Sequence, residues 1–318
     1  MTQRPLVLVI AKPDDAHLSL LADVPHVVVS SPADLGASAH QAEVIFFWAG
    51  SRDLLRVAFL AAPNLRWVHS RAAGLDNALF PELVDSTIPL TNSTGVFSQS
   101  LGEFALAAIL YFAKDLRRML RNQEAGRWAP FDVEEIAGQT AGIVGYGDIG
   151  RAVARCVQAM GMRVLALKRH VPESPDLLIA QFFRPQELKQ MLALCDYVVA
   201  AAPLTPETRH MLSDAEFAAM RRNAVLINIG RGPVVDQAAL IRALQANLIK
   251  GAGLDVFEVE PIPEGDPIYK FENVLVSPHC ADHTKDWLNQ TMRFFIEQYE
   301  RFVSGEPLKN VVDKRLGY

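Results

Sequence analysis

One stretch, residues 140–154, limits the possible folds of this chain more than any other. A short apolar run enters a Gly-x-Gly-x-x-Gly turn made of Gly145, Gly147 and Gly150, and an Ala- and Val-rich segment with helical spacing follows. In such a strand–turn–helix unit the first glycine permits the turn, the second lets the backbone approach a pyrophosphate, and the third allows close packing of helix on strand. The start of the helix also presents unpaired N–H groups and a positive dipole end to phosphates.

The turn alone is a weak signal, because glycine turns between strands and helices also occur for packing. It predicts a dinucleotide site at Gly145, Tyr146, Gly147, Asp148, Ile149 and Gly150 only if the chain around it forms the matching sheet. Strands are predicted at residues 140–144, 163–167, 197–201, 225–229, 253–256 and 274–276, and helices at 148–160, 187–193, 214–220 and 236–246. Six parallel strands with this turn after the first are typical of the doubly wound dinucleotide-binding fold.

The first third of the chain shows a second, smaller α/β pattern. Helical spacing at residues 52–62 lies among short apolar runs, and strands are predicted at 6–11, 26–30, 44–48, 66–69 and, as an edge piece, 88–90. Alternating strands and helices predict a parallel sheet with helices on both faces. A polar hinge at 92–100 then leads into a long apolar helix expected to run from 100 to about 124.

A last helix is expected at residues 287–304, after the second sheet is complete, and we expect it to return to the first domain. The predicted fold class is therefore α/β with two doubly wound parallel-sheet domains. A Rossmann cofactor domain, residues 99–286, is inserted into a smaller flavodoxin-like substrate domain formed by residues 1–98 and 287–318.

Composition excludes several kinds of protein. A chain of 318 residues, half of them apolar, can bury the cores of two domains. Its net charge of −5 gives no basic surface for nucleic acid, and no apolar run reaches the ~18 residues of a membrane span. The three scattered cysteines, Cys156, Cys195 and Cys280, are typical of reduced thiols. We expect a cytoplasmic protein with neither nucleic-acid nor membrane partners.

The residues after the predicted strand 163–167 indicate which dinucleotide is bound. In this fold an acidic residue there usually accepts hydrogen bonds from the ribose of NAD. Here Lys168, Arg169 and His170 follow instead, and arginine suits the 2′-phosphate of NADP. The alternative is a solvated basic turn. The pattern favours NADP, with NAD possible.

Three further stretches place a charged or titratable residue just after an apolar strand: residues 226–236, 253–261 and 276–281. Ligands bind at the carboxyl ends of strands in open α/β sheets. With the glycine turn, these stretches resemble the D-isomer-specific 2-hydroxyacid dehydrogenase family, from about residue 64 to the C-terminus. The resemblance implies a catalytic Arg, Glu and His, which by motif are Arg231, Glu260 directly before Pro261, and His279 after Pro278.

Residue chemistry suggests how these three would act. Arg231 can hold a substrate carboxylate and polarise the neighbouring ketone. His279 can protonate the carbonyl oxygen, or remove the hydroxyl proton in the reverse direction. Glu260 would accept a hydrogen bond from the other ring nitrogen and favour the charged ring. Taken singly, each could be an ordinary surface or loop residue, and Glu258 competes with Glu260 for the acid position.

The resemblance implies further contacts. Asp255 would contact the nicotinamide carboxamide, and the loop around Pro203 would lie beside the adenosine half of the cofactor. The whole expected set of other cofactor residues is Ala202, Pro203, Thr208, Ile229, Gly230 and Ala281. Ala73 and Gly74 match the loop whose N–H groups bind the substrate carboxylate, and Trp48 is expected in the substrate pocket. His279 and His283 stand four residues apart, but no third ligand is evident, so no metal site is predicted; Cys280 is interpreted as a packing residue.

The leading functional hypothesis is an NADPH-preferring reductase of a small 2-oxo acid, with glyoxylate or hydroxypyruvate as first candidates. The alternative is a dinucleotide-sensing corepressor or scaffold on the same fold, against which the lack of basic or disordered tails argues. The resemblance also implies a homodimer that pairs through the helix near residues 100–120.

Overall fold

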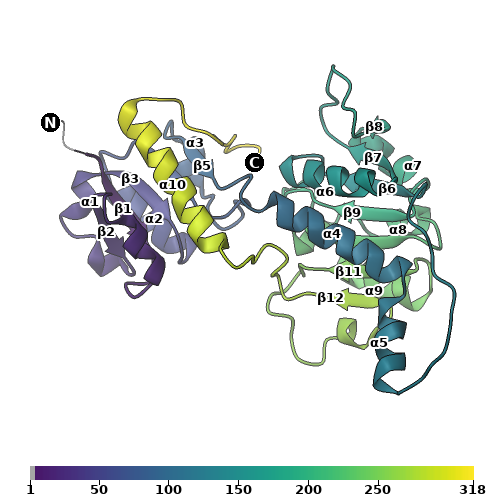
Figure 1. Ribbon diagram of the computed structural model, residues 1–318. Helices are drawn as coiled ribbons and strands as arrows, with labels where there is room; N and C mark the ends of the chain where they lie inside the picture. The colour runs from purple at the N-terminus through teal and green to yellow at the C-terminus, as the bar shows by residue number, and fades with distance from the viewer. Residues whose placement is uncertain (1–3) are drawn as a thin grey trace. The chain divides into compact units, whose positions relative to one another are not determined.

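The computed structural model describes residues 4–318, which form two compact units. The first contains residues up to 97 together with 285–318, and the second contains residues 98–284 (Figure 1). Each unit is built on its own parallel sheet. The fold class predicted from the sequence is confirmed, whereas the predicted roles and limits of the substrate domain and the cofactor domain stay a prediction.

The first unit has a five-stranded sheet in which all neighbours run parallel. Its order is that of flavodoxin-like folds: β2 (His26–Val29), β1 (Leu6–Ile10), β3 (Ala42–Phe47), β4 (Trp67–Ser70) and β5 (Leu90–Asn92). Successive side chains of a strand point to opposite faces, so each strand contributes to two cores. In β1, Leu8 and Ile10 pack with α2 (Arg52–Ala61) and α3 (Pro81–Asp85), while Val7 and Val9 pack with α10 (Trp287–Ser304).

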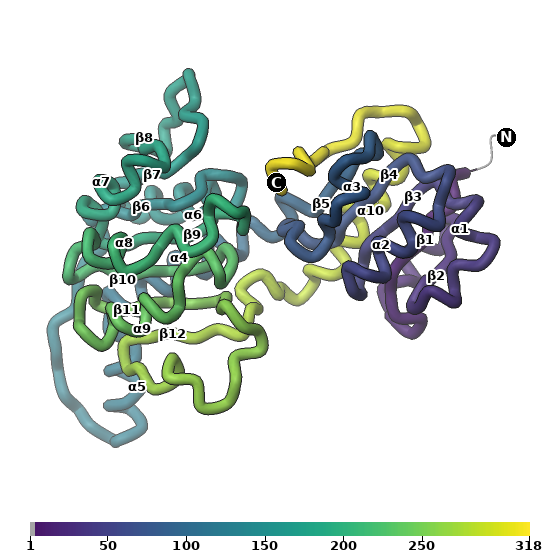
Figure 2. Tube along the Cα trace, turned by 180° about the vertical axis from the view of Figure 1, so that it is seen from behind, coloured from purple at the N-terminus to yellow at the C-terminus, as the bar shows by residue number. Residues whose placement is uncertain are grey.

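Helix α10 covers one face of this sheet. The helix lies in front of the sheet in Figure 1 and behind the sheet in Figure 2. The ring of Phe295 stacks on that of Phe46 at 3.8 Å between centroids, and it lies 5.5 Å from the ring of Trp67. The buried hydroxyl of Tyr299 donates to the carbonyl of Pro5 at 2.7 Å. The chain therefore returns to its first unit after it has completed the second.

The second unit has a seven-stranded parallel sheet. The strand order is β12 (Val274–Val276), β11 (Gly251–Leu254), β10 (Val225–Asn228), β9 (Tyr197–Ala200), β6 (Thr140–Val144), β7 (Arg163–Leu167) and β8 (Gln181–Phe183). The chain reverses direction across the sheet between β6 and β9, which is the switch point where doubly wound folds bind ligands. The prediction of six strands missed β8, which has three residues and begins with an exposed glutamine.

Helices cover both faces of this second sheet (Figures 1 and 2). On one face α4 (Ser98–Ala113) and α6 (Asp148–Ala159) pack together, and a Cβ at Gly102 would lie 3.0 Å from the backbone of Ala152. On the other face apolar side chains of α7 (Leu188–Leu192), α8 (Asp214–Ala219) and α9 (Gln237–Gln245) form one core with the strands. The central strands of this sheet are therefore buried between two layers of helices.

The prediction of one continuous helix over residues 100–124 was wrong. Helix α4 ends at Ala113, and α5 (Leu116–Glu124) begins after Asp115, whose φ is 45°. Aspartate tolerates this left-handed conformation, and its carboxylate accepts the N–H of Arg118, which caps the new helix. None of the α5 side chains is buried, so no core holds the two helices in line. Among residues 4–318, no helix has both the length and the apolar character needed to cross a bilayer.

Candidate active site

The glycine turn joins β6 to α6, and its three glycines serve different purposes. A Cβ at Gly145 would lie 2.5 Å from Cα of Ala202, and one at Gly150 would lie 2.3 Å from the carbonyl of Gly145, so packing requires both. A Cβ at Gly147 would meet nothing within 4 Å, and its φ of −97° suits any residue. Nothing in the described protein demands glycine there, whereas a pyrophosphate approaching the start of α6 would. The turn therefore fits a dinucleotide.

The other residues of the turn have distinct surroundings. Asp148 is exposed and accepts a hydrogen bond from Ser98, and Ile149 is half-buried. Tyr146 is buried, and its hydroxyl donates to Asp176 at 2.8 Å. Burial disfavours the charged form of Asp176, but the N–H of Leu178, the tyrosine hydroxyl and nearby cations hold its pKa below the usual value. The Tyr146 side chain thus ties the turn to the loop after β7.

That loop carries the basic residues predicted to recognise NADP. Arg169 and His170 line an open cavity of about 450 Å³ together with Val171, Arg184, Pro185 and Gln186. The guanidinium of Arg169 lies 3.9 Å from the carboxylate of Glu207. Lys168 does not line this cavity, and its ammonium lies 5.7 Å from the centre of the Tyr146 ring. Arg184 was missed because it follows β8, the strand that the sequence did not reveal.

The loop expected beside the adenosine half follows β9, and two further expected cofactor residues, Ile229 and Gly230, follow β10. The hydroxyl of Thr208 donates to the carbonyl of Pro203 at 2.6 Å and receives the N–H of Thr205 at 2.8 Å, which makes loop 203–208 compact. Ile229 donates its N–H to β9, and a Cβ at Gly230 would lie 2.8 Å from the carbonyl of Ala202. The ends of the two strands are thus in direct backbone contact.

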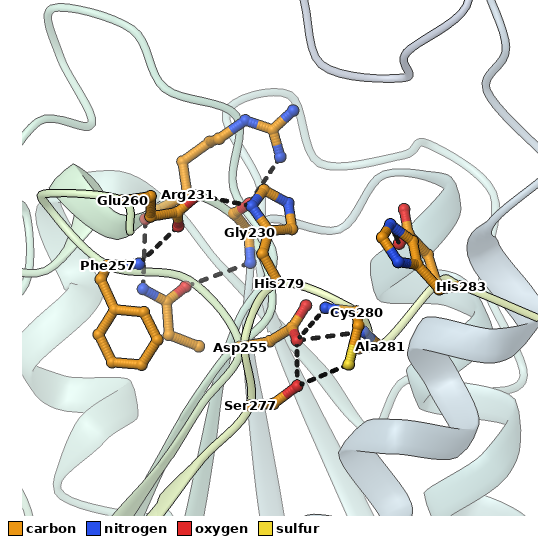
Figure 3. A network of polar contacts seen from close by, with 12 residues as sticks. Gly230, Arg231, Asp255, Phe257, Glu260, Ser277, His279, Cys280, Ala281 and His283 are labelled. Carbon is orange, nitrogen blue, oxygen red and sulfur yellow. Dashed lines mark hydrogen bonds and ion pairs between the residues drawn. The ribbon is translucent and has the colours of Figure 1, made fainter. Parts of the chain in front are cut away.

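Arg231 begins the segment after β10, and Asn228 holds the turn that presents it. The Asn228 amide donates to the carbonyl of Arg231 at 3.2 Å and accepts the N–H of Gly230 at 3.2 Å. The guanidinium donates to the carbonyl of Gly230 at 2.8 Å (Figure 3). A Cβ at Gly232 would lie 1.8 Å from the carbonyl of Phe257, so this segment packs against the one that carries Glu260.

Glu260 and His279 form a direct pair (Figure 3). Oε2 of Glu260 lies 2.7 Å from Nδ1 of His279, and Oε1 accepts the N–H of Phe257 at 2.8 Å. His279 has a φ of 52°, a conformation that costs free energy and is found at functional sites. With Nδ1 facing the carboxylate, Nε2 is the ring nitrogen that can exchange a proton with a ligand.

Asp255 organises the loop on which His279 stands. Its Oδ1, in a side chain that is 1% exposed, accepts hydrogen bonds from Ser277 Oγ at 2.5 Å, Cys280 N at 3.0 Å and Ala281 N at 3.1 Å. The expected nicotinamide contact of Asp255 stays a prediction. Cys280 was interpreted as a packing residue, and this was wrong: its side chain is exposed, because Asp255 binds the loop through the backbone.

His283 lies apart from His279 in the same loop, next to Asp282 (Figure 3). Its Nε2 is 3.6 Å from Oδ1 of Asp282, which is buried without a hydrogen bond, and burial raises the pKa of that carboxyl group. Within residues 4–318, no group of three or more His, Cys, Asp or Glu side chains is arranged to hold a metal ion.

The remaining candidates belong to the first unit. Asn92 donates its amide to the carbonyl of Ala73 at 2.7 Å, which holds the loop that also contains Gly74. Trp48 is 1% exposed, and its indole N–H donates to Asp15 at 2.7 Å. The guanidinium of Arg71 lies 5.0 Å from the Trp48 ring. Trp48 is thus a core residue of this unit, and its expected role toward a substrate stays a prediction.

Comparison with known proteins agrees with this architecture. Residues 106–281 match the family model described as D-isomer specific 2-hydroxyacid dehydrogenase, NAD binding domain. A glyoxylate reductase of Korarchaeum cryptofilum is 37% identical over 264 residues, which cover 81% of this chain and 79% of that protein.

Solved structures with a similar fold include two from bacteria. A D-isomer specific 2-hydroxyacid dehydrogenase from Xanthobacter autotrophicus Py2, in complex with NADPH and MES, has a TM-score of 0.85 and 31% identity, covering 99% of this chain and all of that one. An NADPH-dependent glyoxylate/hydroxypyruvate reductase from Sinorhizobium meliloti, in complex with NADP and sulfate, has a TM-score of 0.85 and 28% identity with the same coverage.

Proposed function

This chain belongs to the D-isomer-specific 2-hydroxyacid dehydrogenase family, and on that basis we propose that it reduces a small 2-oxo acid to the 2-hydroxy acid with NADPH. Glyoxylate and hydroxypyruvate are the first candidate substrates, since relatives are described as glyoxylate or glyoxylate/hydroxypyruvate reductases. The observation that carries the proposal is the 2.7 Å contact between Glu260 and His279, in the same unit as Arg231.

The coenzyme would bind along the carboxyl edge of the second sheet. The turn from Gly145 to Gly150 would hold the pyrophosphate, and the cavity lined by Arg169, His170 and Arg184 offers two guanidinium groups for the 2′-phosphate. NADH remains a possible second coenzyme. When bound, the reduced nicotinamide supplies a hydride to the carbonyl carbon of the substrate.

The protein would contribute binding and proton transfer. The guanidinium of Arg231 would bind the substrate carboxylate. The substrate contact expected of the backbone N–H groups of Ala73 and Gly74 stays a prediction. Nε2 of His279 would donate a proton to the carbonyl oxygen as it becomes a hydroxyl, and accept it in the reverse direction. Glu260 would keep Nδ1 protonated and hold the ring in place. Carbon gains the hydride and oxygen gains the proton, so the reaction balances.

The deciding experiment is a panel of 2-oxo acids assayed separately with NADPH and NADH. We expect turnover of glyoxylate or hydroxypyruvate, with the higher kcat/KM for NADPH. A pure, folded protein that turns over no small 2-oxo acid with either coenzyme would overturn the proposal. A preference for NADH would overturn only the proposal that the basic cavity binds the 2′-phosphate of NADPH.

We further propose that the protein is a homodimer. Near α5, exposed apolar side chains include Leu120, Trp128 and Val133, and Trp128 is 98% exposed. Exposed apolar side chains of this size, where they form one patch, are typical of a surface that another protein covers. Sedimentation equilibrium would test this, since a single species with the mass of one chain at micromolar concentration excludes the dimer.

A further inference from the structure

A second histidine–carboxylate pair lies beside the one proposed for catalysis. Nε2 of His210 is 2.6 Å from Oε1 of Glu258, two residues before Glu260. In the sequence, Glu258 was the alternative to Glu260 for the catalytic glutamate. In the structure it pairs with His210 and not with His279. Both partners are partly exposed, at 44% and 31%, so such a pair adds little to stability. Its position suggests another role.

The backbone around His210 is bound to the segment that follows Arg231. His210 donates its N–H to the carbonyl of Pro233 at 2.8 Å, and Leu212 donates to that of Val234 at 3.2 Å. Asp236 donates back to Leu212 at 3.0 Å, which makes a short parallel bridge. Residues 210–212 are therefore fixed to the segment that begins at Arg231.

The side chain of His210 reaches the other segment. Glu258 also donates its N–H to the side chain of Gln237 at 3.3 Å and accepts the N–H of Gln237 at 3.4 Å. Within the same segment, Phe257 donates its N–H to Oε1 of Glu260. His210 and Gln237 thus both contact Oε1 of Glu258, and Glu260 follows two residues later.

His210 is also continuous with the loop proposed to lie beside the coenzyme. Loop 203–208 is closed by the Thr208 hydroxyl, and Arg209 donates its N–H to Thr205 at 3.0 Å. Met211 donates its N–H to Thr208 at 3.2 Å. His210 therefore sits where a compact loop joins the two segments that carry Arg231 and Glu260, and its φ of 53° holds it in an unusual backbone conformation.

We propose that His210 is a positioning residue. It couples loop 203–208 to the segments that carry Arg231 and Glu260, and it keeps Glu260 aligned with Nδ1 of His279. The inference rests on the proposed function, because it assigns the pair Glu260–His279 to proton transfer. His210 would act through Glu258 and the backbone, without touching the substrate. Small displacements of such a pair are costly to the rate, since proton transfer depends on the position of the ring.

The test uses three variants of the full chain. His210→Gln can still reach Glu258 with an amide N–H, His210→Ala cannot, and His210→Asn keeps a residue that tolerates positive φ but is too short to reach. Arg242→Ala is the matched control, because it removes an exposed ion pair with Asp214 at 2.6 Å in the same unit. Circular dichroism and thermal unfolding establish that each variant is folded.

We expect kcat to fall about tenfold in His210→Ala and His210→Asn, with the KM for NADPH within about twofold, and to recover to within about threefold in His210→Gln. Arg242→Ala should keep the parent kcat. Equal kcat values in all four variants, or no recovery with glutamine, would overturn the proposal.

A second measurement separates this inference from the proposed function. Long-range ¹H–¹⁵N correlation spectra of the histidine rings in the ligand-free protein report which nitrogen of His279 carries the proton. The parent and His210→Gln should show predominantly the Nδ1–H form, and His210→Ala a mixture. If no 2-oxo acid is turned over, the proposed function fails while this spectrum still tests the coupling. An unchanged His279 spectrum in His210→Ala would refute it.

Discussion

The Nδ1 atom of His279 lies 2.7 Å from Oε2 of Glu260, whose other oxygen accepts the backbone N–H of Phe257. The carboxylate is therefore held by its own loop before it meets the ring. The ring stands on a loop that makes three hydrogen bonds to Oδ1 of Asp255, two residues before Phe257. The segment that begins at Asp255 thus holds both the carboxylate and the loop that carries the ring.

Replacing the acid partner should separate catalysis from binding. In Glu260→Gln the ring loses the carboxylate that lies 2.7 Å from Nδ1 and orients it for proton transfer, so we expect kcat to fall about 100-fold. The affinity for NADPH, measured by fluorescence titration, should change less than about twofold. Glu264→Gln, an exposed change in the same loop, is the control and should behave like the parent. A full kcat in Glu260→Gln would contradict the assignment.

Two glycines of the turn, Gly147 and Gly145, should respond in opposite ways to substitution by alanine. Gly147→Ala places a methyl group in open space, so stability should change by less than about 0.5 kcal/mol, while NADPH affinity falls at least about tenfold. Gly145→Ala meets the backbone of Ala202 and should lose about 2 kcal/mol or more. Thermal unfolding and coenzyme titration on both variants are the measurements. Normal NADPH binding by folded Gly147→Ala would show that the pyrophosphate lies elsewhere.

Arg184 should matter more than Lys168 for the choice of coenzyme. Arg184 lines the basic cavity, whereas Lys168 does not, and a lost charge-assisted hydrogen bond costs about 1.5–3 kcal/mol. We therefore expect Arg184→Gln to weaken NADPH binding by about 10- to 100-fold and NADH binding by less than about twofold. Arg222→Gln, at a separate cavity of the same unit, is the control. Equal losses for both coenzymes would exclude a contact with the 2′-phosphate.

Low pH should reduce the free energy of unfolding of the first unit, because the buried side chain of His69 resists protonation. Burial lowers the pKa of this side chain from 6.5 to about 3, and its Nδ1 lies 2.7 Å from the hydroxyl of Thr91. Between these pH values the unfolded chain binds a proton that the folded chain does not. Stability is therefore full above about pH 6.5 and falls by about 1.4 kcal/mol per pH unit as the pH drops toward 3.

The measurement is the free energy of unfolding in urea at pH 7 and pH 5, for the parent and for His69→Gln. The variant should lose about 2 kcal/mol less than the parent over this interval, because glutamine does not titrate. If both proteins lose the same amount, His69 does not control the acid sensitivity.

The sequence was most informative where one motif implies both a strand and its end. The glycine turn, Asn228 to Arg231, and Pro278 to His279 each combine an apolar run with a residue that cannot continue it, so the fold class and the common edge were predictable. The contact of Glu260 with His279 could be expected only from the family resemblance, since 19 residues separate them.

Other features depend on tertiary contacts or on a single dihedral angle. The break at Asp115 follows from one left-handed residue inside an otherwise helical pattern. Strand β8 is too short for periodicity to reveal, and Arg184 was lost with it. Trp48 was expected to face a substrate, and only the structure shows it buried against Phe46 and bonded to Asp15. Its use as a substrate probe therefore requires Trp48→Phe rather than Trp48→Ala, which would leave a cavity in the core.

The position of α10 has a consequence for synthesis on the ribosome. Phe46 and Trp67 are translated before the second unit, but Phe295, which covers their face of the sheet, is made only after that unit. The second unit, 98–284, leaves the ribosome complete while the first still lacks its covering helix. Domains generally fold from the N-terminus during synthesis, but here the first unit cannot be completed before the second has been made. Until α10 emerges, the aromatic face that it covers lacks its partner.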